Sequence, residues 1–210
     1  MTRNKIHSKN ILSAGVPLQE AKKSLILLHG RGGSAEDILA LRQYLNVKEY
    51  ALLAPQAKDN SWYPYSFLAP ILQNEPWLSS ALSLVKETFD EIIAEGISAE
   101  NVYLLGFSQG ACLTLEFAAR NATKFAGVVA FTGGLIGDKI HTENYKGDFK
   151  NTPIFIGTSN PDPHVPVQRV RETTRVLISM HADVTENIYN GMGHTISEDE
   201  IKLANELIFK

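Results

Sequence analysis

Short hydrophobic runs alternate with amphipathic segments along most of the chain. Most of the runs are nearly continuous in Leu, Ile, Val and Phe, which is typical of strands covered on both faces. We predict strands at residues 24–30, 50–55, 101–107, 126–134, 152–158 and 184–190. Residues 9–23, which precede them, are expected to add a hairpin at the edge of the sheet.

The segments between these strands have helical periodicity. Ser34 with Asp37 and Ser197 with Glu200 have the spacing of capping boxes, and Pro76 suits a first helical turn. The predicted helices are Ser34–Asn46, Pro76–Glu95, Gln109–Arg120, Pro166–His181 and one that starts at Ser197. Alternating strands and helices predict an α/β fold with a parallel sheet, helices on both faces and ligands at the carboxyl ends of the strands. Without repeats or a clear linker, residues 1–210 are expected to form a single domain.

Composition and charge narrow the class of protein. The chain is 44% hydrophobic, carries a formal net charge of −3 and has no basic stripe, so a nucleic-acid partner is not expected. Cys112 is the only cysteine, and the polar start "MTRNKIHSKN" lacks the apolar core of a signal peptide. We therefore expect a cytoplasmic protein. No apolar run approaches the roughly 20 residues of a membrane span, so no integral membrane association is expected.

A serine between two glycines, "GFSQG" at residues 106–110, separates a predicted strand from a predicted helix. This pentapeptide is common by chance, but strand-turn-helix is the setting of a nucleophile elbow. Side chains two places before and after the serine would crowd such a turn, so glycine occupies both positions. Ser108 is the candidate nucleophile; alternatively, small residues here serve only to pack the helix on the strand.

A serine nucleophile needs a base and an acid that orients it. Asp162 and His194 follow the strands at 152–158 and 184–190, in the chain order Ser, Asp, His that the fold requires. Asp138 and Asp148, which follow the preceding strand, are weaker candidates for the acid.

The other histidines lie in different settings. We expect His7, His141 and His181 to be solvated, because they lie in polar segments or at a helix end. His29 is expected to brace the loop after the first predicted strand, and His164 to line the substrate pocket.

Attack on an acyl carbon also requires an oxyanion hole formed by two N–H groups. One N–H should come from Gln109, which follows the nucleophile at a helix N-terminus. The other should come from the glycine-rich loop "HGRGG" at residues 29–33. A phosphate-binding loop is disfavoured there, because no G-K-[ST] follows and the G-x-G-x-x-G spacing is absent.

Taken together, "LLHGRGG", "GFSQGA", "NPDPHVP" and "MGHTISEDE" resemble the phospholipase/carboxylesterase family of α/β-hydrolases, which includes acyl-protein thioesterases. The resemblance covers about residues 20–205 and is especially close to small bacterial esterases that carry "HGRG" and "WYPYSF". It implies a triad of Ser108, Asp162 and His194, with an oxyanion hole from the Arg31 and Gln109 N–H groups. It also implies a mostly parallel central sheet, no large cap domain, and no cofactor or metal.

The chain departs from the family pattern at two loops. Acyl-protein thioesterases commonly read "HGLGD" where this chain has "HGRGG". The Arg31 side chain either leans over the site and favours an anionic substrate or points to solvent. The acid loop opens with "GTSN" rather than the HG pair and earlier aspartate often found there.

The pocket candidates lie in an aromatic stretch, "DNSWYPYSFLAPILQNEPW", at residues 59–77, and after "FTGG". The stretch either walls an acyl or aryl pocket, plugs a satellite core, or forms a homodimer interface. Cys112, one helical turn beyond Ser108, is expected to be a packing residue. The proposed pocket residues, besides His164, are Trp62, Tyr63, Tyr65, Phe67, Leu68, Leu135 and Ile136.

These observations predict a serine hydrolase that cleaves small-molecule carboxylic esters. The alternatives are a thioesterase or lysophospholipase acting on longer acyl chains, and a non-catalytic binding protein on a hydrolase scaffold. An intact triad counts against the binding protein, which has no physical need for one.

Overall fold

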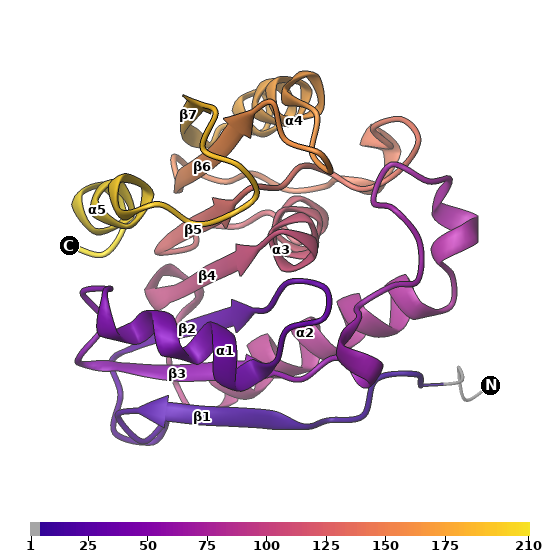
Figure 1. Cartoon of the computed structure of the whole chain (residues 1–210). Coiled ribbons are helices and arrows are strands. Elements are labelled where there is room, and N and C mark those ends of the chain that lie inside the picture. The colour runs from indigo at the N-terminus through magenta and orange to yellow at the C-terminus, as the bar shows by residue number, and fades with distance from the viewer. Residues whose placement is uncertain (1–4) are drawn as a thin grey trace.

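The computed structural model, which describes residues 5–210, is built around one seven-stranded sheet (Figure 1). The first four residues of the polar N-terminal segment lie outside the described part. The strand order is β1-β3-β2-β4-β5-β6-β7, and every neighbouring pair is parallel except β1 with β3. The strands are β1 (Ile11–Gly15), β2 (Lys23–Leu28), β3 (Tyr50–Pro55), β4 (Val102–Phe107), β5 (Gly127–Phe131), β6 (Pro153–Asn160) and β7 (Asp183–Asn190).

Helices cover both faces of the sheet (Figure 1). Helices α1 (Ala35–Leu39) and α5 (Glu198–Leu207) pack on one face, and α2 (Trp77–Ala94), α3 (Gln109–Arg120) and α4 (Val167–Ser179) pack on the other. Short 3₁₀ turns are η1 (Ala40–Gln43), η2 (Lys58–Asn60), η3 (Ile71–Asn74), η4 (Ala99–Asn101) and η5 (Thr142–Asn144). The predicted α/β class with a mostly parallel sheet is confirmed, and residues 5–210 form no separate cap domain.

The continuous hydrophobic runs are explained by burial on both faces, since every residue of β3 and β5 is buried. Two strands end earlier than predicted. The run at 24–30 leaves the sheet after Leu28, and the run at 126–134 leaves it after Phe131. Thr132 has a positive φ of 59°, which turns the chain out of the strand while its N–H donates to the Gly157 carbonyl.

The predicted edge hairpin is wrong, because residues 9–23 contribute only β1 before β2 begins. β1 pairs antiparallel with β3, which lies farther along the chain. Gly15 has a φ of 76°, and the Val16 N–H donates to the Tyr50 carbonyl, which ends the ladder there. The chain then turns at residues 17–20, with the Glu20 N–H bound to the Pro17 carbonyl.

The helix ends follow the capping chemistry of the sequence. Both predicted capping boxes, at Ser34 and Ser197, are present, and Pro76 is the residue before α2 rather than in its first turn. The helix predicted over residues 34–46 is shorter, because α1 ends at Leu39 and continues as η1. Asn205 of α5 then binds the Tyr44 carbonyl and the Asn46 N–H, which holds the end of this segment outside a helix.

The loops after β2 and β4 meet where the strand order reverses. The chain leaves β2 for β3 on one side and later adds β4 on the other side, and ligands of open α/β sheets bind at such a switch point. This position brings residues 29–33 close to Ser108. Between residues 5 and 210, no helix is long and apolar enough to cross a bilayer.

Candidate active site

Ser108 occupies a strained turn between β4 and α3. Its φ of 53° and ψ of −117° lie outside the regions that ordinary residues favour. Its backbone N–H donates to the Phe131 carbonyl at 2.9 Å, which anchors the turn to β5. Strain of this kind persists only where the surrounding structure enforces it, and it is concentrated at functional sites.

The glycines on either side of Ser108 are required by close backbone contacts. A side chain at Gly106 would collide with the Gly110 carbonyl, and a side chain at Gly110 would collide with the carbonyls of Leu28 and His29. Neither glycine has a positive φ, so the reason is space rather than backbone conformation. The contact at Gly110 brings the N-terminus of α3 against the end of β2 and the loop that follows it.

Ser108, His194 and Asp162 form a continuous chain of hydrogen bonds. His194 Nε2 lies 2.8 Å from Ser108 Oγ, and His194 Nδ1 lies 2.8 Å from Asp162 Oδ2. An ionised carboxylate can only accept, so Nδ1 carries the proton and Nε2 accepts from the serine hydroxyl. The Asp162 side chain has no solvent exposure, and that of His194 is 20% exposed. The imidazole is therefore oriented from one side and open to a ligand on the other.

Asp162 is held in its charged form by its surroundings. Burial raises the pKa of its carboxyl group, but hydrogen bonds from His194 and from the backbone N–H groups of His164 and Val165 outweigh burial and bring the pKa below its ordinary value. Both backbone N–H groups donate to Oδ1 at 2.8 Å. The acid loop thus supplies the hydrogen bonds that a buried anion needs.

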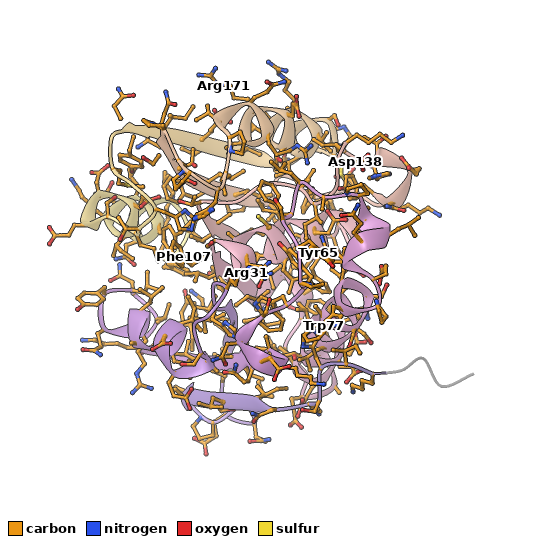
Figure 2. The ribbon with its side chains drawn as sticks, turned by 45° about the vertical axis from the view of Figure 1, so that its right-hand side comes forward. Arg31, Tyr65, Trp77, Phe107, Asp138 and Arg171 are labelled. Atoms are coloured by element: carbon orange, nitrogen blue, oxygen red, sulfur yellow. The ribbon has the colours of Figure 1, made fainter. Side chains whose placement is uncertain are left out.

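The two other carboxylates considered for the acid lie beside different histidines. Asp138 is 3.4 Å from His141, and Asp148 is 2.9 Å from His181. Figure 2 shows Asp138 at a corner of the molecule, away from Arg31 and Phe107. Asp162 is therefore the candidate that contacts His194.

Arg31 and Gln109 border the same cavity as Ser108. In the loop after β2, the Gly32 N–H donates to Asn60 and the Gly33 N–H to Gly30. Across residues 5–210, neither the Arg31 nor the Gln109 backbone N–H donates to another protein group. Within these residues, both N–H groups therefore lack a protein acceptor and are available to a ligand.

Two buried histidines brace this region. His29 is 1% exposed, donates from Nδ1 to the Gly30 carbonyl at 2.7 Å, and accepts at Nε2 from the Ala57 N–H at 3.2 Å. The prediction that His7 is solvated is wrong, because its side chain is fully buried. His7 accepts at Nδ1 from the Lys58 N–H and donates from Nε2 to the Trp62 carbonyl. The reason is tertiary, since the indoles of Trp62 and Trp77 pack around its ring.

We expect both histidines to make stability depend on pH. Burial lowers the pKa of each imidazole, against the opposing effect of backbone hydrogen bonds. The unfolded chain therefore binds more protons than the folded chain below about pH 6.5. Stability is then full above that pH and falls as the pH drops toward the folded-state pKa values. The melting temperature of the wild-type protein should decrease as the pH is lowered from about 7.5 to about 5. The decrease should be smaller in His7→Gln and in His29→Gln. The exposed His181→Gln is the control, and slopes equal to wild type in both variants would contradict this expectation.

The cavity beside Ser108 has a volume of about 740 Å³. Of the predicted pocket residues, Tyr63, Tyr65, Phe67, Leu68 and His164 line it. His164 also packs its ring edgewise with that of His194, with centroids 4.9 Å apart. Tyr63 and Cys112 are each 1% exposed, so only a small part of each side chain faces the cavity.

Trp62, Leu135 and Ile136 do not line this cavity, so the prediction that they do is wrong. All three are fully buried. Trp62 lies under the loop after β2, where its indole N–H donates to the His29 carbonyl at 2.8 Å. Leu135 and Ile136 pack into the hydrophobic core, with their backbone N–H groups bound by Thr173 and Glu116.

Several lining residues were missed by sequence reasoning. The proline-rich segment directly after Asp162 was a usable signal, because a residue next to the acid must lie near the site. The missed lining residues are Pro64, Ser66, Cys112, Pro163, Val165 and Pro166.

Cys112 does not provide a second ready nucleophile in the cavity, because burial raises the pKa of its thiol to about 12, which keeps it neutral. Over the described residues, no group of three or more His, Cys, Asp or Glu is arranged to hold a metal ion.

Comparison with known proteins gives consistent results. Residues 10–210 match the Phospholipase/Carboxylesterase family. The crystal structure of a phospholipase/carboxylesterase from Dyadobacter fermentans is 59% identical, with a TM-score of 0.96 over 97% of this chain and 98% of that one. Acyl-protein thioesterase 1 of Saccharomyces cerevisiae is 28% identical over 92% of this chain and 94% of that protein. A probable carboxylesterase of Arabidopsis thaliana, described as SOBER1-like, is 29% identical over 87% of this chain and 76% of that protein.

The family match covers nearly the whole chain, and the overall fold agrees with that of the Dyadobacter fermentans protein. The chain therefore belongs to the phospholipase/carboxylesterase family of α/β-hydrolases and is a carboxylesterase-type hydrolase.

Proposed function

We propose that the protein hydrolyses small carboxylic esters through an acyl-enzyme on Ser108, with His194 as base and Asp162 as its orienting acid. The observation that carries this proposal is the chain of hydrogen bonds from Ser108 Oγ through His194 to Asp162, each 2.8 Å long. A serine hydroxyl is a weak nucleophile at neutral pH, and this geometry supplies the base that it lacks.

In the first half of the reaction, Ser108 Oγ attacks the ester carbonyl carbon while His194 Nε2 takes the hydroxyl proton. The resulting oxyanion is stabilised by the backbone N–H groups of Arg31 and Gln109, and the positive end of the α3 dipole adds to this stabilisation. The carbon–oxygen bond to the alcohol then breaks, and His194 donates its proton to the leaving oxygen. Asp162 keeps the imidazole in the required tautomer and stabilises its cation.

In the second half, water attacks the acyl carbon. His194 accepts a proton from the water, the tetrahedral intermediate collapses, and the proton returns to Ser108 as the acid product leaves. One imidazole thus acts as base and then as acid in each half.

The cavity favours a short acyl group. Its volume of about 740 Å³ suits a small molecule. Tyr63 and Cys112 line the cavity and are nearly buried, and we infer that they limit the depth that an acyl chain can reach from Ser108. A thioesterase acting on longer chains is the second candidate, because the yeast relative is named an acyl-protein thioesterase.

We expect p-nitrophenyl acetate and butyrate to be hydrolysed with higher kcat/KM than the octanoate, by about 10-fold or more, because a longer acyl chain would meet the nearly buried Tyr63 and Cys112. The measurement is steady-state hydrolysis of this series beside thioesters of matched acyl length. A rise in kcat/KM with chain length, or a preference for thioesters, would replace the proposal with the thioesterase.

A fluorophosphonate probe, followed by peptide mass spectrometry, tests the nucleophile independently of substrate choice. We expect one adduct per chain, on Ser108. No adduct and no turnover of any ester would indicate a binding protein on a hydrolase scaffold.

A further inference from the structure

The segment from Ser61 to Tyr65, whose last three residues line the cavity, is bound by the side chain of Arg31. The Arg31 guanidinium donates from Nη1 to Ser61 Oγ and to the Pro64 carbonyl, both at 3.0 Å, and from Nη2 to the Tyr65 carbonyl at 2.7 Å. Figure 2 shows Arg31 and Tyr65 next to each other on this face of the molecule. The Arg31 side chain thus lies beside the cavity and is hydrogen-bonded to this segment, rather than projecting freely into solvent.

The side chain of Gln109, the first residue of α3, binds the same segment. Its Oε1 accepts from the Trp62 N–H at 2.9 Å, and its Nε2 donates to the Tyr63 carbonyl at 2.7 Å. Gln109 is only 6% exposed, so these hydrogen bonds face little competition from water. Its amide can satisfy a backbone N–H and a backbone carbonyl at once, which an apolar side chain cannot do.

Together the two side chains bind every residue from Ser61 to Tyr65. The segment belongs to no helix or strand, so its backbone groups depend on such partners. The Trp62 indole adds a bond to the His29 carbonyl, in the loop that carries Arg31. The cavity wall and the two candidate oxyanion N–H groups are therefore held as one connected unit.

We propose that the side chains of Arg31 and Gln109 are positioning residues, which fix the oxyanion N–H groups of their own backbones by anchoring them to the cavity wall. This inference rests on the proposed ester hydrolysis. In an oxyanion hole made only of backbone groups, the side chains at these positions would be irrelevant to kcat. Here, losing the anchor lets the N–H groups move from the position of the oxyanion, and a displacement of about 1 Å costs on the order of 100-fold in rate.

The test is to replace each side chain while keeping its backbone N–H. In Arg31→Met and Gln109→Met we expect kcat for p-nitrophenyl acetate to fall by about 10- to 100-fold. KM should stay within about 3-fold of wild type, because the loss is in the transition state. The inhibition constant of phenylboronic acid, which forms a tetrahedral adduct with the serine, should rise by a factor similar to the loss in kcat. The exposed Arg42→Met and Gln19→Met are matched controls, for which we expect wild-type values.

Conservative variants and the double variant separate positioning from general stability. Arg31→Lys keeps a donor that can reach some of the three acceptors, so its kcat should be partly restored relative to Arg31→Met. Gln109→Glu keeps the acceptor for the Trp62 N–H, but its carboxylate faces the Tyr63 carbonyl. Its kcat should therefore be restored less. Both side chains hold one segment, so the double methionine variant should lose less than the product of the single losses. If a methionine variant is unfolded at the assay temperature, the lysine and glutamate variants provide the same comparison.

Unchanged kcat in both methionine variants, or a loss confined to KM, would overturn the inference. Fluorophosphonate labelling of Ser108 in wild type keeps this result separate from the proposed function. If wild type is labelled and turns over esters while the variants match it, only the positioning role fails. If wild type is not labelled at Ser108, the proposed function fails, and the inference fails with it.

Discussion

Replacing Ser108 by alanine should lower kcat for ester hydrolysis by about 10⁴- to 10⁶-fold, the range seen when a catalytic serine is removed from a triad. Alanine leaves His194 without the hydroxyl that lies 2.8 Å from its Nε2, so no acyl-enzyme can form. The free oxyanion N–H groups remain, and they account for the small residual rate above uncatalysed hydrolysis. The fold should persist, because the Ser108 backbone bond to Phe131 does not involve the side chain.

The measurement combines steady-state kinetics with thermal unfolding and intact-mass analysis after fluorophosphonate treatment. Ser108→Ala should show no adduct and a melting temperature close to that of wild type. Ser83→Ala, on the exposed side of α2, is the matched control and should retain full activity and labelling. Substantial turnover by a folded Ser108→Ala would exclude Ser108 as the nucleophile.

Much of the fold could be predicted because its central strands are buried on both faces. Burial of all of β3 and β5 requires continuous hydrophobic runs, and capping boxes mark where α1 and α5 begin. The edge hairpin could not be predicted correctly, because the partner of β1 is β3, which lies about 40 residues farther along the chain. Local pattern contains no information about such a pairing.

The candidate site was predictable in its polar centre and less so in its walls. Ser108, Asp162 and His194 each follow a strand, and the carboxyl ends of parallel strands meet at one edge of the sheet. Trp62 and Tyr63 are neighbours in one aromatic stretch, yet Trp62 lies under the loop after β2 and Tyr63 lines the cavity. That difference is set by tertiary contacts with His7 and His29, which sequence cannot rank.

The side chains of Arg31 and Gln109 show the same limit. The Gln109 N–H was predicted from its place after Ser108, and the Arg31 N–H from the resemblance to a family. The partners of their side chains lie in a segment about 30 residues after Arg31 and about 48 residues before Gln109. Loop segments of this kind carry function and have no periodicity from which their contacts could be inferred.

Replacing Asp162 by asparagine should lower kcat by about 10⁴-fold while leaving the fold intact. Asparagine can still accept from the backbone N–H groups of His164 and Val165, which bind Asp162 Oδ1 at 2.8 Å. Its amide N–H₂ then faces His194 Nδ1 and requires that nitrogen to accept. The imidazole proton moves to Nε2 and points at Ser108, so His194 can no longer take the hydroxyl proton.

The pKa of Asp162 predicts a second effect of this variant. Because its pKa is below the ordinary value in the folded protein, the wild-type carboxylate adds stability above about pH 4, and this contribution is lost as the pH falls through the folded-state pKa. Asp162→Asn cannot show this loss, so its melting temperature should decline less than that of wild type at acid pH.

The control for the loss of kcat is Asp148→Asn, which removes the exposed Asp148–His181 pair at 2.9 Å and should keep wild-type kcat. Near-normal kcat in Asp162→Asn would show that Asp162 is not the group that orients His194. A large loss of kcat in Asp148→Asn would point to Asp148 instead.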